Sequence, residues 1–358
     1  MKIEDNKPLD DLNTFGLKVS AQYFAEVNSV EEFRELMEME IYKTNKKLIL
    51  GGGSNILFTD CVKGLVVKNS IKGISILSET ETEVILKANA GEVWHEFVLW
   101  CIERNYAGIE NLSLIPGLVG AAPMQNIGAY GVEIKDVFQE LEAINMESGE
   151  IVKFVLSDCE FGYRESVFKN KCKGKFFIAS VTFKLTKLSS PKAIYQFKTD
   201  YGDIKNILSD MRAYELSIKA VSDAVIQIRN SKLPNPKELG NAGSFFKNPT
   251  ISKEQFDKLV LQYPIMPSYP SAEKSGMKQI TQLPNVPIAY KIPAGWLIEQ
   301  CGWKGKVVGN TGSHKSQALV LVNYGNANGK EIWNLALEIQ KSVREKFGIE
   351  IMPEVNVV

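Results

Sequence analysis

A run of small and polar residues, "SLIPGLVGAAPMQNIGAYGVE" at positions 113–133, constrains the fold more than any other stretch, and we call it the glycine-rich loop. An apparently structureless stretch of this length is unusual in a compact domain unless it has a function. Small residues at this density let the backbone approach a flat or phosphorylated ligand. Gln125 and Asn126 can also hydrogen-bond to a ring edge, and we therefore expect this loop to bind a ligand. Its glycines are Gly117, Gly120, Gly128 and Gly131.

A second glycine cluster, "LILGGGSNILF", places three glycines before Ser54 and Asn55, and we call residues 51–55 the glycine turn. Backbone amides in such a turn can face an anion closely, as a diphosphate requires. The third glycine of a G-x-G-x-x-G fingerprint is replaced by Ile56, and no Gly-Lys-Ser/Thr follows, so neither a Rossmann fingerprint nor a P-loop is supported. The residues alone leave a diphosphate site and a plain hairpin turn equally open.

The remaining pattern alternates helices and strands. A length of 358 residues suggests two or three domains, and 44% apolar with 23% charged residues is typical of a soluble protein with a large core. Ser29 and Glu32 have capping-box spacing, and Gly108 has the place of a glycine that ends a helix. Helices are expected over 29–43, 93–108, 252–263 and 330–348, and strands on either side of the glycine turn within 46–58 and over 64–69, 83–91, 140–155, 175–185 and 318–324.

Charge and cysteine usage exclude several function classes. Lys+Arg and Asp+Glu number 42 each, so no net field draws the chain to nucleic acid or to an anionic membrane. The five cysteines are odd in number and form no CxxC pair, so neither zinc nor a disulfide framework is expected. No signal peptide and no apolar run of membrane-spanning length occurs, which indicates a cytoplasmic protein.

Ser244 in "GNAGSFFKNP" has the setting of an exposed serine on a sharp turn. A nucleophilic serine needs a base, and the chain has only two histidines. His95 is expected on the solvent-facing side of its helix, whereas His314 precedes a strand, where it can contact a ligand. No Asp/His pair can be argued for Ser244, so a serine hydrolase is disfavoured.

Two charged residues admit two interpretations each. Arg164, after Tyr163 in "FGYRES", can clamp a carboxylate, but a surface ion pair with Glu160 or Glu165 is favoured by this fragment alone. Glu354, after a proline, is either a buried catalytic carboxylate or, more commonly, an outward-facing strand residue. Four polar residues lie near glycine and proline turns in the C-terminal part of the chain, and they are either solvated or in contact with a diphosphate: Lys232, Asn248, Lys291 and Lys304.

Eight stretches stand out in order along the chain: "NTFG", "GGGSN", "ENLSLIPGLVGAAPMQNIGAYG", "FGYRES", "NAGSFFKNP", "AGWLIEQCG", "HKSQALVLVN" and "MPEV". They run from residue 13 to residue 355 and form a far more specific set than any single glycine loop. Taken together, they resemble the UDP-N-acetylenolpyruvoylglucosamine reductase family of flavoenzymes.

The resemblance implies an α+β fold of three domains. Residues 1–70 and 71–229 would form a pair of FAD-binding subdomains of the vanillyl-alcohol-oxidase-like (PCMH) type, and residues 230–358 the substrate domain. It also implies FAD as cofactor, NADPH as reductant and UDP-N-acetylglucosamine enolpyruvate as substrate, in the synthesis of a peptidoglycan precursor. We expect a monomer that binds these small molecules, with no metal, nucleic acid or membrane partner.

The resemblance further assigns site residues. The catalytic trio would be Arg164, Ser244 and Glu354. The FAD contacts would be Gly51, Gly52, Gly53, Ser54, Asn55, Ile115, Pro116, Gly117, Gly120, Ala121, Gln125, Asn126, Gly128 and Arg229. The substrate contacts would be Tyr163, Tyr201, Lys232, Asn248, Lys291, Lys304 and Gln317. Tyr201 lies in "TDYGDI", whose tyrosine marks the family's first subtype.

Departures from the family pattern and two alternative functions remain. Asn310 and Thr311 stand where the family more often has small residues, and Asn356 stands where some relatives carry arginine. One alternative is a related flavin oxidase acting on a sugar alcohol. The other is a non-catalytic protein that binds a UDP-sugar, which the presence of the complete catalytic trio disfavours.

Overall fold

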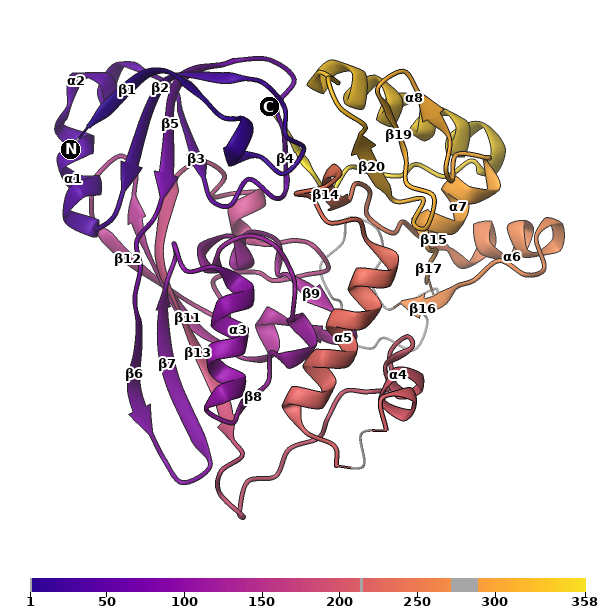
Figure 1. The fold of residues 1–358 in the computed structure, drawn as a ribbon, viewed down its shortest axis with the longest axis horizontal. Helices are drawn as coiled ribbons and strands as arrows, with labels where there is room; N and C mark the ends of the chain where they lie inside the picture. The colour runs from indigo at the N-terminus through magenta and orange to yellow at the C-terminus, as the bar shows by residue number, and fades with distance from the viewer. Residues whose placement is uncertain (1, 213–214, 272–288) are drawn as a thin grey trace. The chain divides into compact units, whose positions relative to one another are not determined.

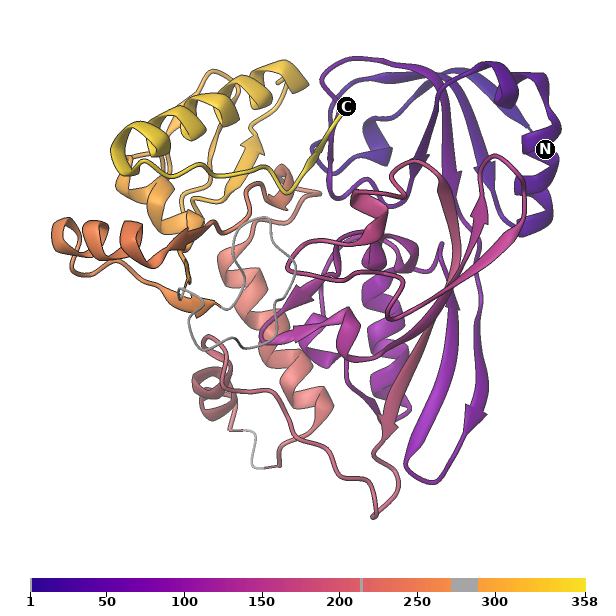
Figure 2. The same ribbon diagram turned by 180° about the vertical axis from the view of Figure 1, so that it is seen from behind.

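The chain divides into two compact units. The computed structural model describes residues 2–212, 215–271 and 289–358 (Figures 1 and 2). The first unit comprises Met1–Leu12, Val19–Ser54 and Cys61–Ser231, and the second comprises Asn13–Lys18, Asn55–Asp60 and Lys232–Val358. The expected three-domain division, with boundaries after residues 70 and 229, stays a prediction.

The first sheet of unit 1 has the strand order β1-β2-β5-β3, in which β2, β5 and β3 are parallel. Ser29 Oγ accepts a hydrogen bond from Glu32 N–H, which confirms Ser29 as the N-cap, but Glu32 accepts its bond from Asn28 N–H and not from the Ser29 N–H of a capping box. Phe33 on the following helix stacks on Phe177 with ring centroids 4.0 Å apart. The elements are β1 (Ile3–Pro8), β2 (Ser20–Val27), α1 (Val30–Glu38), α2 (Glu40–Thr44), β3 (Lys47–Leu50) and β5 (Val62–Asn69).

The second sheet of unit 1 is antiparallel, with the order β12-β11-β13-β7-β6, and β8 also pairs with β13. Its core includes Trp94 and Phe97 of α3, which pack against Phe183 of β13. The elements are β6 (Ile74–Glu79), β7 (Glu83–Asn89), α3 (Trp94–Glu103), β8 (Tyr106–Ala107), β11 (Phe138–Asn145), β12 (Ile151–Val155) and β13 (Phe176–Lys187), and η1 (Asp10–Leu12) lies between β1 and β2 of the first sheet.

The expectation that Gly108 ends α3 is wrong. The helix ends at Glu103, and Asn105 has a φ of 58°. Asparagine tolerates this left-handed conformation and replaces glycine after many helices. Gly108 is instead needed for close packing, because a Cβ there would lie 2.8 Å from Cγ1 of Val137.

The glycine-rich loop is more ordered than its sequence suggests. It contains η3 (Val119–Gln125), a 3-10 helix that includes Pro123, and the paired short strands β9 (Gly128–Ala129) and β10 (Val132–Glu133). Their residues lack the periodicity that marks longer elements, so the sequence pattern could not reveal them. Further short elements of unit 1 are η2 (Glu110–Leu112), η4 (Ile134–Asp136) and η5 (Val167–Lys169).

Two helices of unit 1, α4 (Ile204–Asp210) and α5 (Ile218–Lys232), were not among the expected elements. In α5, the buried residues Ile218, Val221, Val225 and Ile228 recur at helical spacing. This periodicity was available in the sequence. Its importance is that α5 carries Arg229.

Unit 2 has a sheet of order β14-β20-β19-β18, a sheet of order β15-β17-β16, and a parallel pair, β21-β4. Because β3 and β4 lie in different sheets, the glycine turn between them is not a hairpin. The strands are β4 (Ile56–Leu57), β14 (Gly240–Ser244), β15 (Thr250–Ser252), β16 (Tyr269–Ser271), β17 (Ala289–Lys291), β18 (Val307–Val308), β19 (Thr311–Ser313), β20 (Val320–Asn323) and β21 (Asn356–Val357).

The helices of unit 2 are α6 (Lys253–Gln262), α7 (Ala294–Gln300) and α8 (Gly329–Phe347). The long helix α8 begins with a capping box of Asn328 and Glu331 and ends before Gly348, which has a φ of 65°. The mixture of helices and mainly antiparallel sheets confirms the α+β class. Over the ranges that the structure describes, no helix is long and apolar enough to cross a membrane.

Candidate flavin and substrate site

The glycine turn and the glycine-rich loop approach each other closely where both carry glycine. A Cβ on Gly52 would lie 2.9 Å from Cα of Gly117, and a Cβ on Gly117 would lie 2.9 Å from Oγ of Ser54. Gly53 and Gly117 also have φ values of 64° and 113°. Glycine is the residue that allows both the approach and these dihedrals. The two segments that the sequence analysis assigned to one ligand are therefore brought together within unit 1.

The N-terminal turn of α3 makes two hydrogen bonds with the glycine-rich loop and a third with Leu112, which directly precedes it. Trp94 N–H donates to Gly117 O (3.0 Å), Trp94 Nε1 donates to Leu112 O (2.9 Å), and Leu114 N–H donates to His95 Nδ1 (3.0 Å). Leu114 has a φ of 58°, which is costly for a leucine and needs such support. The loop is thus positioned by the helix that precedes it.

His95 is half-buried and faces the loop, so the expectation of a solvent-facing histidine is wrong. Burial, and then the neighbouring charge of Arg229, lower the pKa of His95 below its usual value, with Glu96 opposing them. A neutral imidazole with Nδ1 as acceptor is the form that the bond from Leu114 requires.

Arg164 lies on a tight turn in which Gly162 and Glu165 exchange backbone hydrogen bonds of 3.0 and 3.2 Å. Its Nη2 donates to Gly128 O (2.8 Å), and its guanidinium carbon lies 5.4 Å from the centroid of the Tyr163 ring. Ser166 Oγ donates to Met124 O (2.6 Å) and ties the same turn to η3. Arg164 therefore contacts the glycine-rich loop.

Arg229 is delivered to the same region by α5. Burial lowers the pKa of its guanidinium, whose charge also interacts with Tyr130 and Arg164. Its Nε is buried and makes no hydrogen bond to any described residue. Such a buried donor suits an anionic or electron-rich group. Gly51, Gly52 and Gly53 leave the backbone of the glycine turn uncovered by side chains. Together with Arg229, these residues fit FAD, because its diphosphate is anionic and its ring is flat.

Asn126 contributes to the loop itself. Its side chain is fully buried, its Nδ2 donates to Glu133 Oε2 and Gly162 O (3.0 Å each), and its Oδ1 accepts from Lys135 N–H (3.1 Å). Both amide donors are thus used within the protein, so a ligand contact from this residue would come from its backbone. Gln125 Oε1 accepts from Lys169 Nζ at 3.5 Å.

Tyr201 packs against the C-terminal part of the glycine-rich loop. Its ring meets that of Tyr130 edge to face, with centroids 6.4 Å apart, and a Cβ on Gly131 would lie 3.6 Å from its Cβ. Tyr201 is 55% exposed, so its hydroxyl end is available to a ligand.

Ser244 and Glu354 are neighbours within unit 2. Ser244 ends β14 after a register irregularity between Asn241 and Ser244, where Gly243 has a φ of 69°. A bulge of this kind redirects side chains. Glu354 N–H donates to Phe245 O (2.7 Å), and Asn55 Nδ2 donates to Glu354 O (3.3 Å). The segment after Pro353 is therefore fixed beside the strand that carries the serine, and Glu354 itself lies just outside β21.

Asn248 and Gln317 meet the start of α7. Ala294 N–H donates to Asn248 Oδ1 (2.9 Å), and Gln317 Oε1 lies 3.0 Å from the position of a Cβ on Gly295. Because Asn248 uses its oxygen in this way, its Nδ2 is the group that can face a ligand. Lys304 is exposed and pairs with Glu299 (2.8 Å), Lys232 is exposed, and Lys291 is half-buried on β17.

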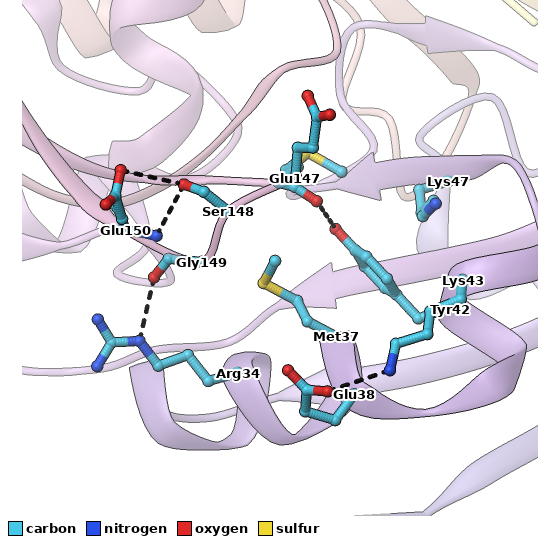
Figure 3. Close-up of a pocket in the computed structure, with 11 residues that line it drawn as sticks. Arg34, Met37, Glu38, Tyr42, Lys43, Lys47, Glu147, Ser148, Gly149 and Glu150 are labelled. Carbon is cyan, nitrogen blue, oxygen red and sulfur yellow. Dashed lines mark hydrogen bonds and ion pairs between the residues drawn. The ribbon is translucent and has the colours of Figure 1, made fainter.

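A cavity of about 630 Å³ lies elsewhere in unit 1, between α1, α2 and the β11–β12 turn (Figure 3). Arg34 Nε donates to Gly149 O (3.3 Å) and Tyr42 Oη donates to Met146 O (2.9 Å) across it. Burial raises the pKa of Tyr42 to about 12. The lining mixes basic and acidic side chains in equal number and includes none of the expected site residues, so it carries no functional assignment.

Unit 1 thus brings together Gly51–Ser54, the glycine-rich loop, Arg164, Arg229 and Tyr201. In unit 2, Glu354 is held beside the strand of Ser244, and Asn248 and Gln317 both lie at the start of α7. Sequence reasoning gave no role to three polar residues that hold this region: His95, Glu110 and Asn111. The last two lie in the quoted "ENL" of the family motif, which was the signal that could have found them.

Comparison with known proteins gives a consistent picture. An FAD binding domain model matches residues 21–154, and the model "UDP-N-acetylenolpyruvoylglucosamine reductase, C-terminal domain" matches residues 235–358. The expected FAD-binding domain is thereby confirmed. The chain is also similar over its full length to two UDP-N-acetylenolpyruvoylglucosamine reductases. That of Flavobacterium johnsoniae is 49% identical and that of Amoebophilus asiaticus 47%, with 100% of both chains covered in each case.

A solved structure shares the fold. The crystal structure of UDP-N-acetylenolpyruvylglucosamine reductase from Thermus caldophilus matches with a TM-score of 0.64 at 21% sequence identity. The match covers 100% of this chain and 99% of that chain.

Proposed function

The chain belongs to the UDP-N-acetylenolpyruvoylglucosamine reductase family of FAD-dependent oxidoreductases, and on this basis we propose that it reduces UDP-N-acetylglucosamine enolpyruvate to UDP-N-acetylmuramate with NADPH. The observation that carries the proposal is the fixed pairing of Glu354 with the strand of Ser244, through the 2.7 Å bond from Glu354 N–H to Phe245 O. This pairing fixes the backbone of Glu354 beside the strand that carries Ser244, and a hydroxyl and a carboxyl are the groups that the proposed reaction needs.

FAD, when bound, would take hydride from NADPH and supply it to the methylene carbon of the enolpyruvyl ether. The residues that would hold it are the glycine turn, the glycine-rich loop from Ile115 to Gly128, and Arg229. The backbone amides of the glycine turn suit the diphosphate, and the guanidinium of Arg229 suits an electron-rich edge of the ring. Because NADPH and UDP-sugars are cytoplasmic metabolites, we expect the reaction to take place there.

Arg164 and Glu354 are proposed to stabilise the negative charge that develops on the substrate. Hydride addition to the methylene carbon leaves charge on the adjacent carbon, delocalised into the conjugated carboxylate as an enediolate. A guanidinium offers a planar pair of donors to that carboxylate. A protonated or proton-sharing Glu354 would donate to the same group, and preorganised donors of this kind contribute about 3 kcal/mol each.

Ser244 is proposed to protonate the carbanion-like carbon. A serine hydroxyl stays protonated at physiological pH, and such a carbon is basic enough to accept its proton without a strong acid. The requirement is therefore placement within hydrogen-bond reach. The bulge at Gly243, which fixes the direction of the strand before Ser244, supports this role.

Seven further residues are proposed to contact the substrate. Two are aromatic, Tyr163 and Tyr201. The others carry amide and ammonium groups suited to a diphosphate: Lys232, Asn248, Lys291, Lys304 and Gln317.

Ser244→Ala tests the mechanism. The variant should still allow NADPH to reduce the flavin, because that half-reaction needs no proton from Ser244. Reoxidation of the flavin by the enolpyruvyl substrate should slow by about 10²- to 10⁴-fold. Stopped-flow absorbance of the two half-reactions, measured separately, gives both rates.

The matched control is Ser342→Ala, which removes a hydroxyl that only donates to Glu338 O on α8. It should leave both half-reactions unchanged. Equal slowing of the two half-reactions in Ser244→Ala would remove Ser244 from the role of proton donor.

A further inference from the structure

We infer that Glu110 and Asn111 are positioning residues for the substrate, because they fasten the segment that carries Tyr201, residues 195–202, to the glycine-rich loop. The inference rests on the proposed role of Tyr201 as a substrate contact. Both residues belong to η2, which directly precedes the loop.

Asn111 joins the two segments with one amide group. Its side chain is fully buried, and its Nδ2 donates to Lys198 O (2.7 Å) and to Tyr130 O (3.0 Å). One acceptor belongs to the Tyr201 segment and the other to the glycine-rich loop. A buried donor group shared in this way fixes the separation of the two backbones, because one amide must satisfy both carbonyls at once.

Glu110 holds the start of the same segment. It is 1% exposed, and its carboxylate accepts hydrogen bonds from the Tyr195 hydroxyl and from Gly108 N–H (2.8 Å). Burial, and then the charge of Glu110, raise the pKa of Tyr195. Tyr195 therefore remains a protonated donor, and a hydrogen bond to a charged acceptor is among the stronger kinds.

The far end of the segment is fixed by packing. Tyr201 meets Tyr130 edge to face, and a Cβ on Gly202, whose φ is 65°, would lie 3.9 Å from the Tyr130 ring. The segment is thus attached at Tyr195, at Lys198 and at Tyr201, while the Tyr201 side chain stays 55% exposed. This arrangement presents the tyrosine to a ligand from a rigid base and lowers the ordering cost of binding.

Tyr195→Phe is the sharpest test, because it keeps the aromatic contact with Phe197 (centroids 5.2 Å apart) and removes only the hydroxyl. In the FAD-loaded enzyme, KM for the enolpyruvyl substrate should rise about tenfold with kcat unchanged, the pattern of lost binding rather than lost chemistry. Flavin content and the rate of flavin reduction by NADPH should match the wild type.

The matched control is Tyr106→Phe, because the Tyr106 hydroxyl also donates to a glutamate, Glu79 (3.4 Å), but outside the Tyr201 segment. It should leave KM unchanged. A rise in KM in the control equal to that in Tyr195→Phe would make the effect a general one of losing a tyrosine hydroxyl and would overturn the inference.

A double-mutant cycle then separates this inference from the proposed function. If Glu110 acts through Tyr201, adding Tyr195→Phe to Tyr201→Ala should change KM by less than about twofold. The positioning role would be overturned if Tyr195→Phe raised KM by the full tenfold in the Tyr201→Ala background, or if it left KM unchanged in the wild-type background. Neither result would contradict the proposed reaction. An unchanged KM in Tyr201→Ala alone would instead remove Tyr201 as a substrate contact, and the inference with it.

Discussion

At the scale of single residues, the protonation state of one side chain decides whether it can accept a hydrogen bond that holds this site. The clearest case is His95, whose Nδ1 accepts from the strained Leu114. Its pKa is lowered chiefly by burial and then by Arg229 on α5, against the opposing charge of Glu96 on its own helix. Because the folded state favours the neutral ring, the stability that His95 contributes is complete above the unfolded pKa of 6.5 and is lost as pH falls below it.

His95→Asn should reduce this acid sensitivity. The asparagine Oδ1 takes the place of Nδ1 as acceptor but does not titrate. Urea unfolding of wild type and variant at pH 7 and at about pH 5.5 measures the effect, and the wild type should lose more stability between the two.

The matched control is His314→Asn. The pKa of His314 is also lowered, by burial and then by Lys315, but His314 lies in unit 2. His314→Asn should therefore also reduce the loss of stability at low pH, whereas its FAD content should match the wild type, so it is the control for FAD retention and not for pH dependence. Identical pH dependence in wild type and His95→Asn would contradict the role assigned to His95.

At the scale of elements, the turn and the loop form one site because their glycines permit contact between backbones. A substitution at Gly117 tests this. Its φ of 113° disfavours an L-residue, and a Cβ would lie 2.9 Å from Ser54 Oγ. Gly117→Ala should therefore displace the loop from the glycine turn, and the purified protein should contain much less FAD by its visible absorbance.

Gly174→Ala is the control for backbone strain alone. Gly174 has a φ of 71° but no atom within 4 Å of the position of its Cβ. It should cost about 1 kcal/mol of stability and keep its FAD. Full FAD content in Gly117→Ala would show that the close approach is not required for binding.

At the scale of the whole molecule, FAD binding and folding should be linked in unit 1. A ligand that binds only the folded state stabilises it by RT ln(1 + [L]/Kd), about 2.7 kcal/mol at a hundredfold excess over Kd. Adding FAD to flavin-free protein should therefore raise the unfolding temperature with increasing concentration. Hydrogen exchange should show new protection at 51–54 and 113–131 and no change in α8. An unfolding temperature that does not depend on FAD concentration would contradict this linkage.

Local signals in the sequence determined much of the fold. The caps at Ser29 and Asn328, with their helices α1 and α8, follow from residues a few positions apart, and so do the alternating strands β7, β11 and β13. The end of α3 was misplaced because asparagine, like glycine, can adopt the left-handed conformation there. The periodicity of α5 was present but was not used.

The sequence by itself also determined the family, through the order of its motifs, and it named Arg164, Ser244 and Glu354 as residues of interest. Only the tertiary structure decided that the glycine turn is not a hairpin, that Gly52 meets Gly117, that His95 faces the loop, and that Asn111 bridges Tyr130 and Lys198. The physical reason is that periodicity and capping depend on neighbours along the chain, whereas these contacts join residues far apart in sequence. Their partners are fixed only when the sheets and helices have packed.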